Sequence, residues 1–168
     1  RVCKMFSTRL IQYARLLIGD CAEKGQRIVT AESCTGGLIA GCLTEIAGSS
    51  AVVDCGYVTY SNEAKRDLLG VPGDMIADYG AVSEPVVRAM AEGALQESRA
   101  HIAVAVTGIA GPGGGTPMKP VGLVHIACLR ENRRMLHEVH HFGDLGRSEI
   151  RMKTIEGAFD LIQRQLES

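Results

Sequence analysis

The sequence predicts an α/β protein with a mixed, mostly parallel sheet. Short apolar segments rich in β-branched residues alternate with segments whose apolar residues recur at helical spacing. The segments 27–31 and 51–60 flank a helical pattern at 35–47, and a βαβ unit of this kind makes its two strands parallel. The segments 121–130 and 133–141 are almost contiguous, which predicts an antiparallel hairpin.

The first half of the chain contains one helix and the βαβ unit. A helix is expected from Ser7 to Glu23, because its apolar residues form one stripe and Gly25 follows as a stop. The strand 27–31 is short, apolar and β-branched, so it is expected to be buried. The helix 35–47 and the strand 51–60 complete the unit.

The middle of the chain is predominantly helical. Ser61 is expected to cap a short helix from Asn62 to Leu69, because serine oxygens accept hydrogen bonds from first-turn N–H groups. A further short turn or helix is expected at 74–79. Ser83-Glu84-Pro85 begins a longer helix, since proline is tolerated in a first turn.

The last part of the chain returns to strands. A third strand is expected at 101–107, and a glycine-rich loop, Gly108 to Pro120, follows it. Loops of this length in compact domains are often functional. The hairpin 121–130 and 133–141 comes next, and a final helix is expected from Arg147 to Leu166.

Composition narrows the classes of function. The chain has 168 residues, so we expect one domain over 1–168. A net charge of −1, 4% aromatic residues and no tryptophan argue against direct nucleic-acid binding. No apolar run is long enough to span a bilayer, and no signal peptide is visible. The chain begins at Arg1 rather than at methionine, which leaves open whether residues precede it.

The cysteines are scattered and form no Cys-x-x-Cys pair, which favours a reducing, cytoplasmic setting over a disulfide framework. They are Cys3, Cys21, Cys34, Cys42, Cys55 and Cys128. No cofactor and no metal are expected. The hairpin offers an edge strand poor in polar residues, and from it we expect a homo-oligomer.

Ser33 is the candidate nucleophile. It lies after the strand 27–31 and before the helix 35–47, near backbone N–H groups and the positive end of a helix dipole. The same N–H groups would hold the oxyanion that its attack creates. The alternative is that Ser33 or Thr35 is only the N-cap of the helix.

Three strand ends are expected to meet near Ser33, because ligands of such sheets bind beyond the carboxyl ends of the strands. The second end brings Tyr60 and Lys65, and the third brings the loop after Thr107. The helix dipole and partial burial would lower the pKa of Lys65, so that it could take the Ser33 proton. Tyr60 would relay the proton or orient the amine. The alternatives are a solvated lysine and a packed aromatic ring.

The glycine loop could wrap a phosphate or close over a substrate. It is not a Walker loop, because no Gly-Lys-Ser/Thr follows, and Pro117 and Pro120 argue against a dinucleotide fingerprint. Arg147 and Arg151 are four residues apart on one helix face and could clamp a phosphate. The alternative is an ordinary solvated face.

Two further sequence features suggest a different chemistry, namely a zinc site and a cysteine nucleophile. The string His137-Glu138-Val139-His140-His141 matches the zinc-protease pattern, but that chemistry requires a helix and this segment is predicted to be a strand. Cys34 is a competing nucleophile beside Ser33. Side chains of adjacent residues usually point apart, so only one of the two is expected to face the site.

Several segments together resemble the C-terminal domain of the competence/damage-inducible protein CinA. The resemblance covers nearly the whole chain and rests on residues 31–37, 56–62, Lys65, 80–83 and 107–114. It implies a three-layer α/β/α fold around a mixed five-stranded sheet. Longer relatives carry an extra N-terminal domain that resembles molybdopterin-binding proteins. This sequence contains no such domain and resembles the stand-alone form.

The family includes nicotinamide-nucleotide amidohydrolases, which convert nicotinamide mononucleotide to nicotinate mononucleotide and ammonia in pyridine nucleotide salvage. The resemblance implies that Ser33 is the nucleophile and Lys65 the base, with Tyr60 nearby. It makes a pyridine nucleotide the expected small-molecule partner. The residues expected to contact the substrate are Thr35, Gly36, Gly37, Thr107, Gly108, Gly111, Gly113, Arg147 and Arg151.

The sequence departs from the family pattern at one place, and two alternative functions stay open. The family usually reads Gly-Asp-Arg before the last helix, whereas here Leu145-Gly146 separates Asp144 from Arg147, which leaves the direction of Arg147 open. The first alternative function is a phosphate-ligand binding module without chemistry. The second is a protein-interaction role linked to DNA uptake, as the family name suggests.

Overall fold

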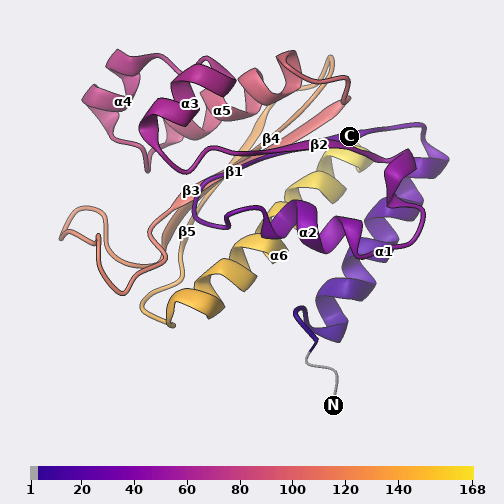
Figure 1. Cartoon of the computed structure of the whole chain (residues 1–168), viewed down its shortest axis with the longest axis horizontal. Coiled ribbons are helices and arrows are strands. Elements are labelled where there is room, and N and C mark those ends of the chain that lie inside the picture. Colours follow the sequence, from indigo (N-terminus) through magenta and orange to yellow (C-terminus); the bar gives the residue numbers. More distant parts are fainter. Residues whose placement is uncertain (1–3) are drawn as a thin grey trace.

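A computed structural model, which describes residues 4–168, has a five-stranded sheet between two layers of helices (Figure 1). The strand order is β2-β1-β3-β4-β5. The strands are β1 (Ile28–Glu32), β2 (Val53–Val58), β3 (Ile102–Gly108), β4 (Leu123–Arg130) and β5 (Leu136–His141). The predicted mixed α/β sheet is therefore confirmed.

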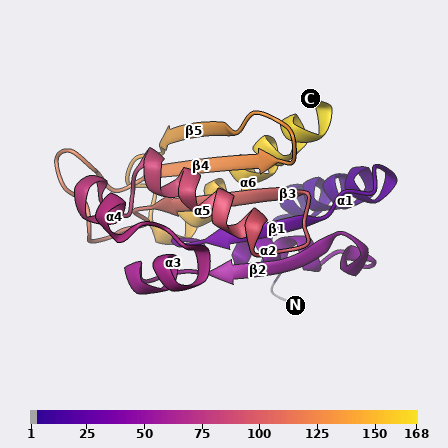
Figure 2. The same ribbon diagram turned by 90° about the horizontal axis from the view of Figure 1, so that it is seen from above.

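The strand directions match the two predictions made from the connections. β1 pairs in parallel with both β2 and β3, while β4 pairs antiparallel with β3 and with β5. It follows that β4 alone runs against the other four strands, as Figure 2 shows from above. The chain leaves β1 towards one edge of the sheet and later returns to its other side at β3. This makes the carboxyl end of β1 a switch point, where ligands of α/β sheets bind.

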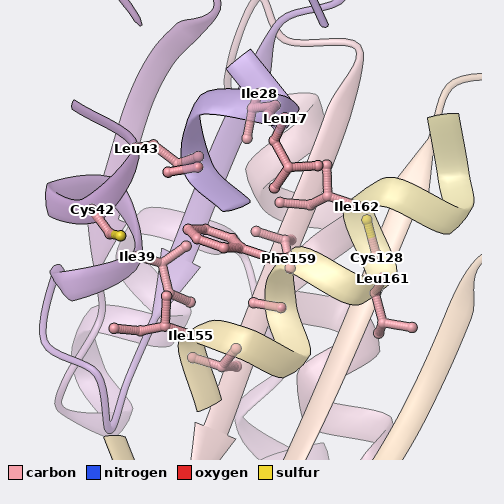
Figure 3. Packing of buried hydrophobic residues seen from close by; sticks show 14 of the residues in the cluster. Leu17, Ile28, Ile39, Cys42, Leu43, Cys128, Ile155, Phe159, Leu161 and Ile162 are labelled. Carbon is pink, nitrogen blue, oxygen red and sulfur yellow. The ribbon is translucent and has the colours of Figure 1, made fainter. Parts of the chain in front are cut away.

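The helices divide between the two faces of the sheet. One face is covered by α1 (Thr8–Glu23), α2 (Leu38–Thr44) and α6 (Arg147–Glu167), and the other by α3 (Asn62–Leu69), α4 (Gly73–Tyr79) and α5 (Glu84–Gln96) (Figure 1). Each layer has its own apolar core. Figure 3 shows the first core, in which Phe159 of α6 lies among side chains of α1, α2 and the sheet. The three-layer expectation is confirmed.

The main boundary differences come from glycines and turns. The helix expected at 35–47 spans only Leu38–Thr44, because Gly36 and Gly37 have φ angles of 58° and 99°, which a continuing right-handed helix cannot contain. The strand expected at 51–60 begins at Val53, after a 3₁₀ turn, Ser49–Ala51. The strand expected at 133–141 begins at Leu136. Ser7 and Ser61 cap α1 and α3 as predicted.

Packing between α3 and α5 depends on a residue without a side chain. A Cβ on Gly93 would lie 1.9 Å from the backbone oxygen of Leu69, and backbone cannot move aside as a side-chain end can. We expect Gly93→Ala to lower the free energy of unfolding by about 3 kcal/mol, as overpacking does. The matched control is Gly19→Ala in α1, where nothing lies within 4 Å.

The control should raise stability by about 0.5–1 kcal/mol, because alanine favours a helix over glycine. Urea unfolding followed by circular dichroism measures both variants. Equal stability of the two variants would show that α5 can move away from Leu69 at little cost.

Candidate active site

A cavity of about 280 Å³ opens beyond the carboxyl ends of β1, β2 and β3. The segments that follow these strands converge there, together with the segment before α5 and the first residue of α6. The lining residues are Ser33, Cys34, Tyr60, Asn62, Lys65, Ala81, Val82, Thr107, Gly108, Ile109, Ala110, Gly111, Gly113, Gly114 and Arg147. The predicted convergence of three strand ends is therefore confirmed.

The centre of the cavity is a serine–lysine pair. Lys65 Nζ lies 3.1 Å from Ser33 Oγ, although the two residues are 32 positions apart in the sequence. Only 1% of Lys65 is exposed, although it lies in the first turn of α3. The expected proximity of these two groups is confirmed.

The oxygen atoms nearest to the amine of Lys65 belong to a hydroxyl and to two backbone carbonyls. Besides Ser33 Oγ, it meets the backbone oxygens of Thr59 at 2.8 Å and Tyr60 at 3.5 Å. A neutral amine has two N–H groups and one lone pair. If the two N–H groups donate to the two carbonyls, the lone pair is directed at the hydroxyl of Ser33, which is the arrangement that a general base needs.

Burial lowers the pKa of Lys65 from its usual value of 10.5, and the neighbouring Cys34 opposes this effect. An ammonium group loses its hydration inside the protein, so the neutral form is favoured. From the sequence, the helix dipole as well as burial is expected to lower this pKa. Burial is the largest cause in the folded protein.

Glu32 builds the loop that carries Ser33, and sequence reasoning gave it no role. Its buried carboxylate accepts hydrogen bonds from the N–H groups of Ile39 at 2.8 Å and Ala40 at 3.0 Å. It also accepts hydrogen bonds from the hydroxyls of Thr35 at 2.6 Å and Thr30 at 3.1 Å. The carboxylate therefore ties the end of β1 to the start of α2. The signal in the sequence was an acidic residue at the end of an otherwise apolar strand.

This arrangement corrects the expected source of oxyanion stabilisation. Ser33 was expected to lie directly against the N–H groups that begin the helix. In the structure α2 begins only at Leu38, and Glu32 already occupies the N–H groups of Ile39 and Ala40. Because a carboxylate saturates these donors, they are not free for a substrate oxygen.

Tyr60 is placed differently from the expectation that it relays a proton or orients the amine through its phenol. The side chain is 60% exposed, and its hydroxyl accepts a hydrogen bond from Arg147 at 2.9 Å. Its backbone oxygen, rather than its phenol, faces Lys65 Nζ. Tyr60 thus lines the cavity, and its ring belongs to the rim.

Arg147 faces the cavity despite the Leu145-Gly146 insertion. Gly146 has a φ of 89°, and α6 begins directly after it. The guanidinium donates to the backbone oxygen of Gly111 at 2.8 Å and to the Tyr60 hydroxyl. Arg147 therefore joins the glycine loop to the segment after β2, and the direction left open by the sequence is settled.

Four residues expected to contact the substrate do not line the cavity. Thr35 is fully buried and donates its hydroxyl to Glu32. Gly36 and Gly37 form the left-handed turn before α2. Arg151 donates to the backbone oxygens of Cys34 and Thr35, each at 3.1 Å. These residues support the loop that carries Ser33 from the side away from the cavity, and the sequence could not distinguish such a position from direct contact with the substrate.

The loop residues expected at the site are present there. Thr107, Gly108, Gly111 and Gly113 all line the cavity. The hydroxyl of Thr107 donates to the backbone oxygen of Ala81 at 2.9 Å, so it links β3 to the segment before α5. Sequence reasoning missed several lining residues, namely Asn62, Ala81, Val82, Ile109, Ala110 and Gly114. All six fall inside the segments that carry the family resemblance.

Cys34 is not a competing nucleophile in this geometry. Its side chain is buried, and burial raises the pKa of its thiol to about 12. A thiol of this kind is protonated at neutral pH, and the thiolate is the reactive form. Cys21, Cys42, Cys55 and Cys128 are also free thiols, while Cys3 lies outside the described residues.

The His-Glu-x-x-His string lies in β5, as predicted, and not in a helix. His137 Nε2 lies 3.0 Å from His125 Nδ1, and His137 Nδ1 lies 3.4 Å from Glu84 Oε1. Burial, assisted by His137, lowers the pKa of His125 to about 4. Within residues 4–168 no cluster of three or more His, Cys, Asp or Glu side chains is placed to hold a metal ion.

Over residues 4–168, none of the helices combines the length with the apolar character that a membrane span needs.

Fold and site together define a class of protein: an α/β protein with a buried lysine–serine pair at the switch point of its sheet. A family model described as "CinA C-terminal domain" matches residues 11–166. The chain therefore belongs to the CinA C-terminal domain family, as the sequence resemblance implied.

Relatives and solved structures agree with this assignment. The chain is 53% identical over 144 residues to a "CinA-like protein" of Mycobacterium sp. (strain JLS), covering 85% of this chain and 34% of the relative. The crystal structure of competence/damage inducible protein CihA from Agrobacterium tumefaciens superposes with a TM-score of 0.95 at 53% identity, covering 99% and 100% of the two chains. The competence damage-inducible protein A (ComA) from Klebsiella pneumoniae gives a TM-score of 0.89 at 34% identity, covering 94% and 97%.

The chain spans about a quarter to a third of the length of the curated relatives that it matches, with coverages of 26%, 34% and 27% in three of them. It corresponds in length to the Agrobacterium protein, which it covers completely.

Proposed function

We propose that this chain is a metal-independent amidohydrolase that removes ammonia from the carboxamide of nicotinamide mononucleotide and leaves nicotinate mononucleotide. Ser33 is the nucleophile, and Lys65 is the base that activates it. The observation that carries the proposal is the 3.1 Å separation of Lys65 Nζ and Ser33 Oγ, with the amine buried and its pKa lowered.

The reaction is balanced by these two groups and one water molecule. Ser33 Oγ attacks the carboxamide carbon while its proton moves to Lys65 Nζ, and the C=O electron pair moves to oxygen. When the tetrahedral intermediate collapses, the C–N bond breaks and Lys65 gives the proton to the leaving ammonia. Water then attacks the acyl-enzyme and passes its proton to Lys65, which returns it to Ser33 Oγ as the ester bond breaks.

The charges around the cavity favour an anionic substrate. Among the described residues that line the cavity, none is an aspartate or a glutamate, whereas Arg147 carries a permanent positive charge. Arg147 uses two nitrogens for Gly111 and Tyr60, and its planar fork has further donors that suit a phosphate. This supports a nucleotide with its carboxamide at Ser33 and its phosphate at the rim.

Ammonia release from a panel of amides tests the proposal. The panel is nicotinamide mononucleotide, nicotinamide riboside and free nicotinamide, measured with a coupled glutamate dehydrogenase assay. We expect the highest kcat/KM for the mononucleotide, because only it carries the phosphate that Arg147 would bind. No ammonia from any of the three, with the protein folded, would overturn the proposal.

A phosphate-ligand binding module is the second candidate, since the same basic rim would bind a nucleotide without turnover. Calorimetry distinguishes the two candidates. Saturable binding of nicotinamide mononucleotide without formation of nicotinate mononucleotide would favour the binding module over the enzyme.

A further inference from the structure

A pair of histidines lies between the β4–β5 hairpin and the first turn of α5. Nδ1 of His125 in β4 lies 3.0 Å from Nε2 of His137 in β5. The two rings are inclined by only 18°, and their centroids are 5.3 Å apart. This separation is close to the N···N distance plus the two ring radii, so the rings meet edge to edge and the two nitrogens point at each other. One hydrogen therefore joins the rings.

A carboxylate sets the direction of this hydrogen bond. His137 Nδ1 lies 3.4 Å from Glu84 Oε1, and Arg88 Nε donates to the same oxygen at 2.8 Å. The hydrogen bond from Arg88, with a smaller contribution from His137, keeps the pKa of Glu84 below its usual value, so Glu84 is ionised. The carboxylate attracts a hydrogen on Nδ1 of His137, which leaves Nε2 to accept the hydrogen on His125 Nδ1. Both rings are then neutral and paired.

The pair accommodates one added proton but not two. A first proton gives His137 an N–H on both sides, one towards Glu84 and one towards His125, whose Nδ1 then accepts. A second proton places an N–H on each of the two facing nitrogens, so that two donors and two positive charges oppose each other at 3.0 Å. Burial, assisted by His137, lowers the pKa of His125 to about 4, and burial lowers the pKa of His137.

The other charged groups around the pair do not offset this repulsion. Those whose charges act on either ring are Glu84 and Arg88 of α5, Lys119 of the glycine loop, and Glu138, His140 and His141 of β5. Both carboxylates are already paired with arginines, Glu84 with Arg88 and Glu138 with Arg164. β3, which flanks β4 on its other side, contains no charged residue. A second proton therefore finds no free carboxylate among the described groups that face the pair.

The pair is connected to the cavity through the start of α5. Glu84 is the first residue of α5, and Ala81 and Val82, just before it, line the cavity. On β3, Thr107 lies directly opposite His125 and donates its hydroxyl to the backbone oxygen of Ala81. Side chains of directly opposed residues share one face of a sheet. Separation of the two rings would therefore break the contact between Glu84 and β5 and disturb Thr107, and both of these hold the cavity wall.

We propose that the His125–His137 pair is an acid-sensitive switch on the cavity wall formed by Ala81 and Val82. The switch is closed while the pair carries at most one added proton, and it opens when both rings are protonated. Acid then weakens ligand binding in the cavity by a route that does not involve Lys65. The choice of ligand rests on the proposed function, whereas the opening of the switch can be measured without any ligand.

The first test is amide hydrogen exchange in wild type and His125→Asn. Asparagine keeps a donor at the place of Nδ1 but takes no proton, so its switch stays closed in acid. The reporter is the N–H of Val87, which donates to Ser83 in the first turn of α5. Because opening takes up one proton, its protection factor in wild type should fall about tenfold per pH unit from about pH 5.5 to about 4.5, and stay constant in His125→Asn.

Two controls accompany this measurement. The N–H of Ile150, in the first turn of α6, should show no such slope in either protein. His101→Asn is the same substitution at the other end of the sheet, where Nδ1 of His101 accepts from the N–H of Arg27, and it should behave as wild type. His137→Gln replaces Nε2 by an amide that takes no proton, and it serves if His125→Asn does not fold.

The second test is calorimetric binding of nicotinamide mononucleotide in the Ser33→Ala background, where the ligand is not consumed. At about pH 4, half of the molecules with His125 carry the second proton, so their dissociation constant should be about twice that of the His125→Asn protein. The titration of the ligand's own phosphate is the same in both proteins and cancels.

Each other result has a definite meaning. Equal exchange slopes for Val87 in wild type and His125→Asn would overturn the inference. Different slopes with equal dissociation constants would also overturn it, because the switch would then not act on the cavity. If nicotinamide mononucleotide binds neither protein at neutral pH, the proposed function fails, and the exchange slopes alone decide the inference.

Discussion

Ser33→Ala is expected to reduce ammonia release from nicotinamide mononucleotide by at least about 10³-fold, because loss of the nucleophile removes the covalent route entirely. The substitution deletes one oxygen, and that oxygen's described partner is Lys65 Nζ. The fold should therefore be unaffected, and binding of the substrate should persist. Steady-state kinetics, together with calorimetric titration of the inactive variant, measure both effects.

The matched control for this variant is Ser98→Ala. Ser98 follows α5, and its hydroxyl donates to the backbone oxygen of Leu95. Its variant should retain wild-type activity. If Ser33→Ala also retained activity, Ser33 would not be the nucleophile. The neighbouring Cys34 would be a poor substitute, since burial raises the pKa of its thiol to about 12.

Lys65→Met is expected to lower kcat by about 10²- to 10⁴-fold, which is the usual contribution of a general base. Methionine is similar in length to lysine but has no amine to accept the Ser33 proton. Lys65→Arg should be equally impaired, because arginine cannot lose its proton at any accessible pH. Activity in Lys65→Arg would instead mean that a positive charge, and not a base, is required at this place.

The pH dependence gives an independent measurement of the same residue. Burial lowers the pKa of Lys65 below 10.5, and only the neutral amine is a base. The kcat/KM of the wild type should therefore rise with pH through this lowered pKa and then level off. The rise should disappear in the residual activity of Lys65→Met.

The free energy of unfolding should also depend on the protonation of Lys65. Between the lowered pKa and 10.5, the unfolded chain binds the extra proton, so the free energy of unfolding of the wild type increases with pH across that interval. Lys65→Met should lack this contribution. Denaturant titrations at several pH values compare the two proteins, and equal slopes would show that Lys65 is not buried as a neutral group.

Much of the fold follows from local patterns. The Ser61 cap predicted α3 with its observed bounds, and the nearly contiguous strands at 121–141 predicted the hairpin of β4 and β5. The errors lie where backbone conformation departs from the side-chain pattern. Helical spacing continues through Gly36 and Gly37, but their positive φ angles delay α2 to Leu38.

Part of the candidate site could be predicted from the order of the strands and helices. The carboxyl ends of parallel strands meet at one edge, so Ser33, Lys65 and the Thr107 loop could be brought together from the order of elements. The part that each neighbouring polar residue plays was not predictable. Glu32, Thr35 and Arg151 have the same chemical groups as substrate-binding residues, and only their positions direct them into the protein.

The sequence by itself determined the class of fold, the place of the loop that carries Ser33 and the lysine that faces it, because these depend on periodicity, connection length and strand order. Only the tertiary structure decided that Glu32 occupies the first N–H groups of α2, where the Tyr60 hydroxyl points and that Arg151 lies behind the loop. The physical reason is that hydrogen bonds between distant segments depend on positions within a few tenths of an ångström. Packing of the whole chain fixes those positions, and a local pattern does not encode them.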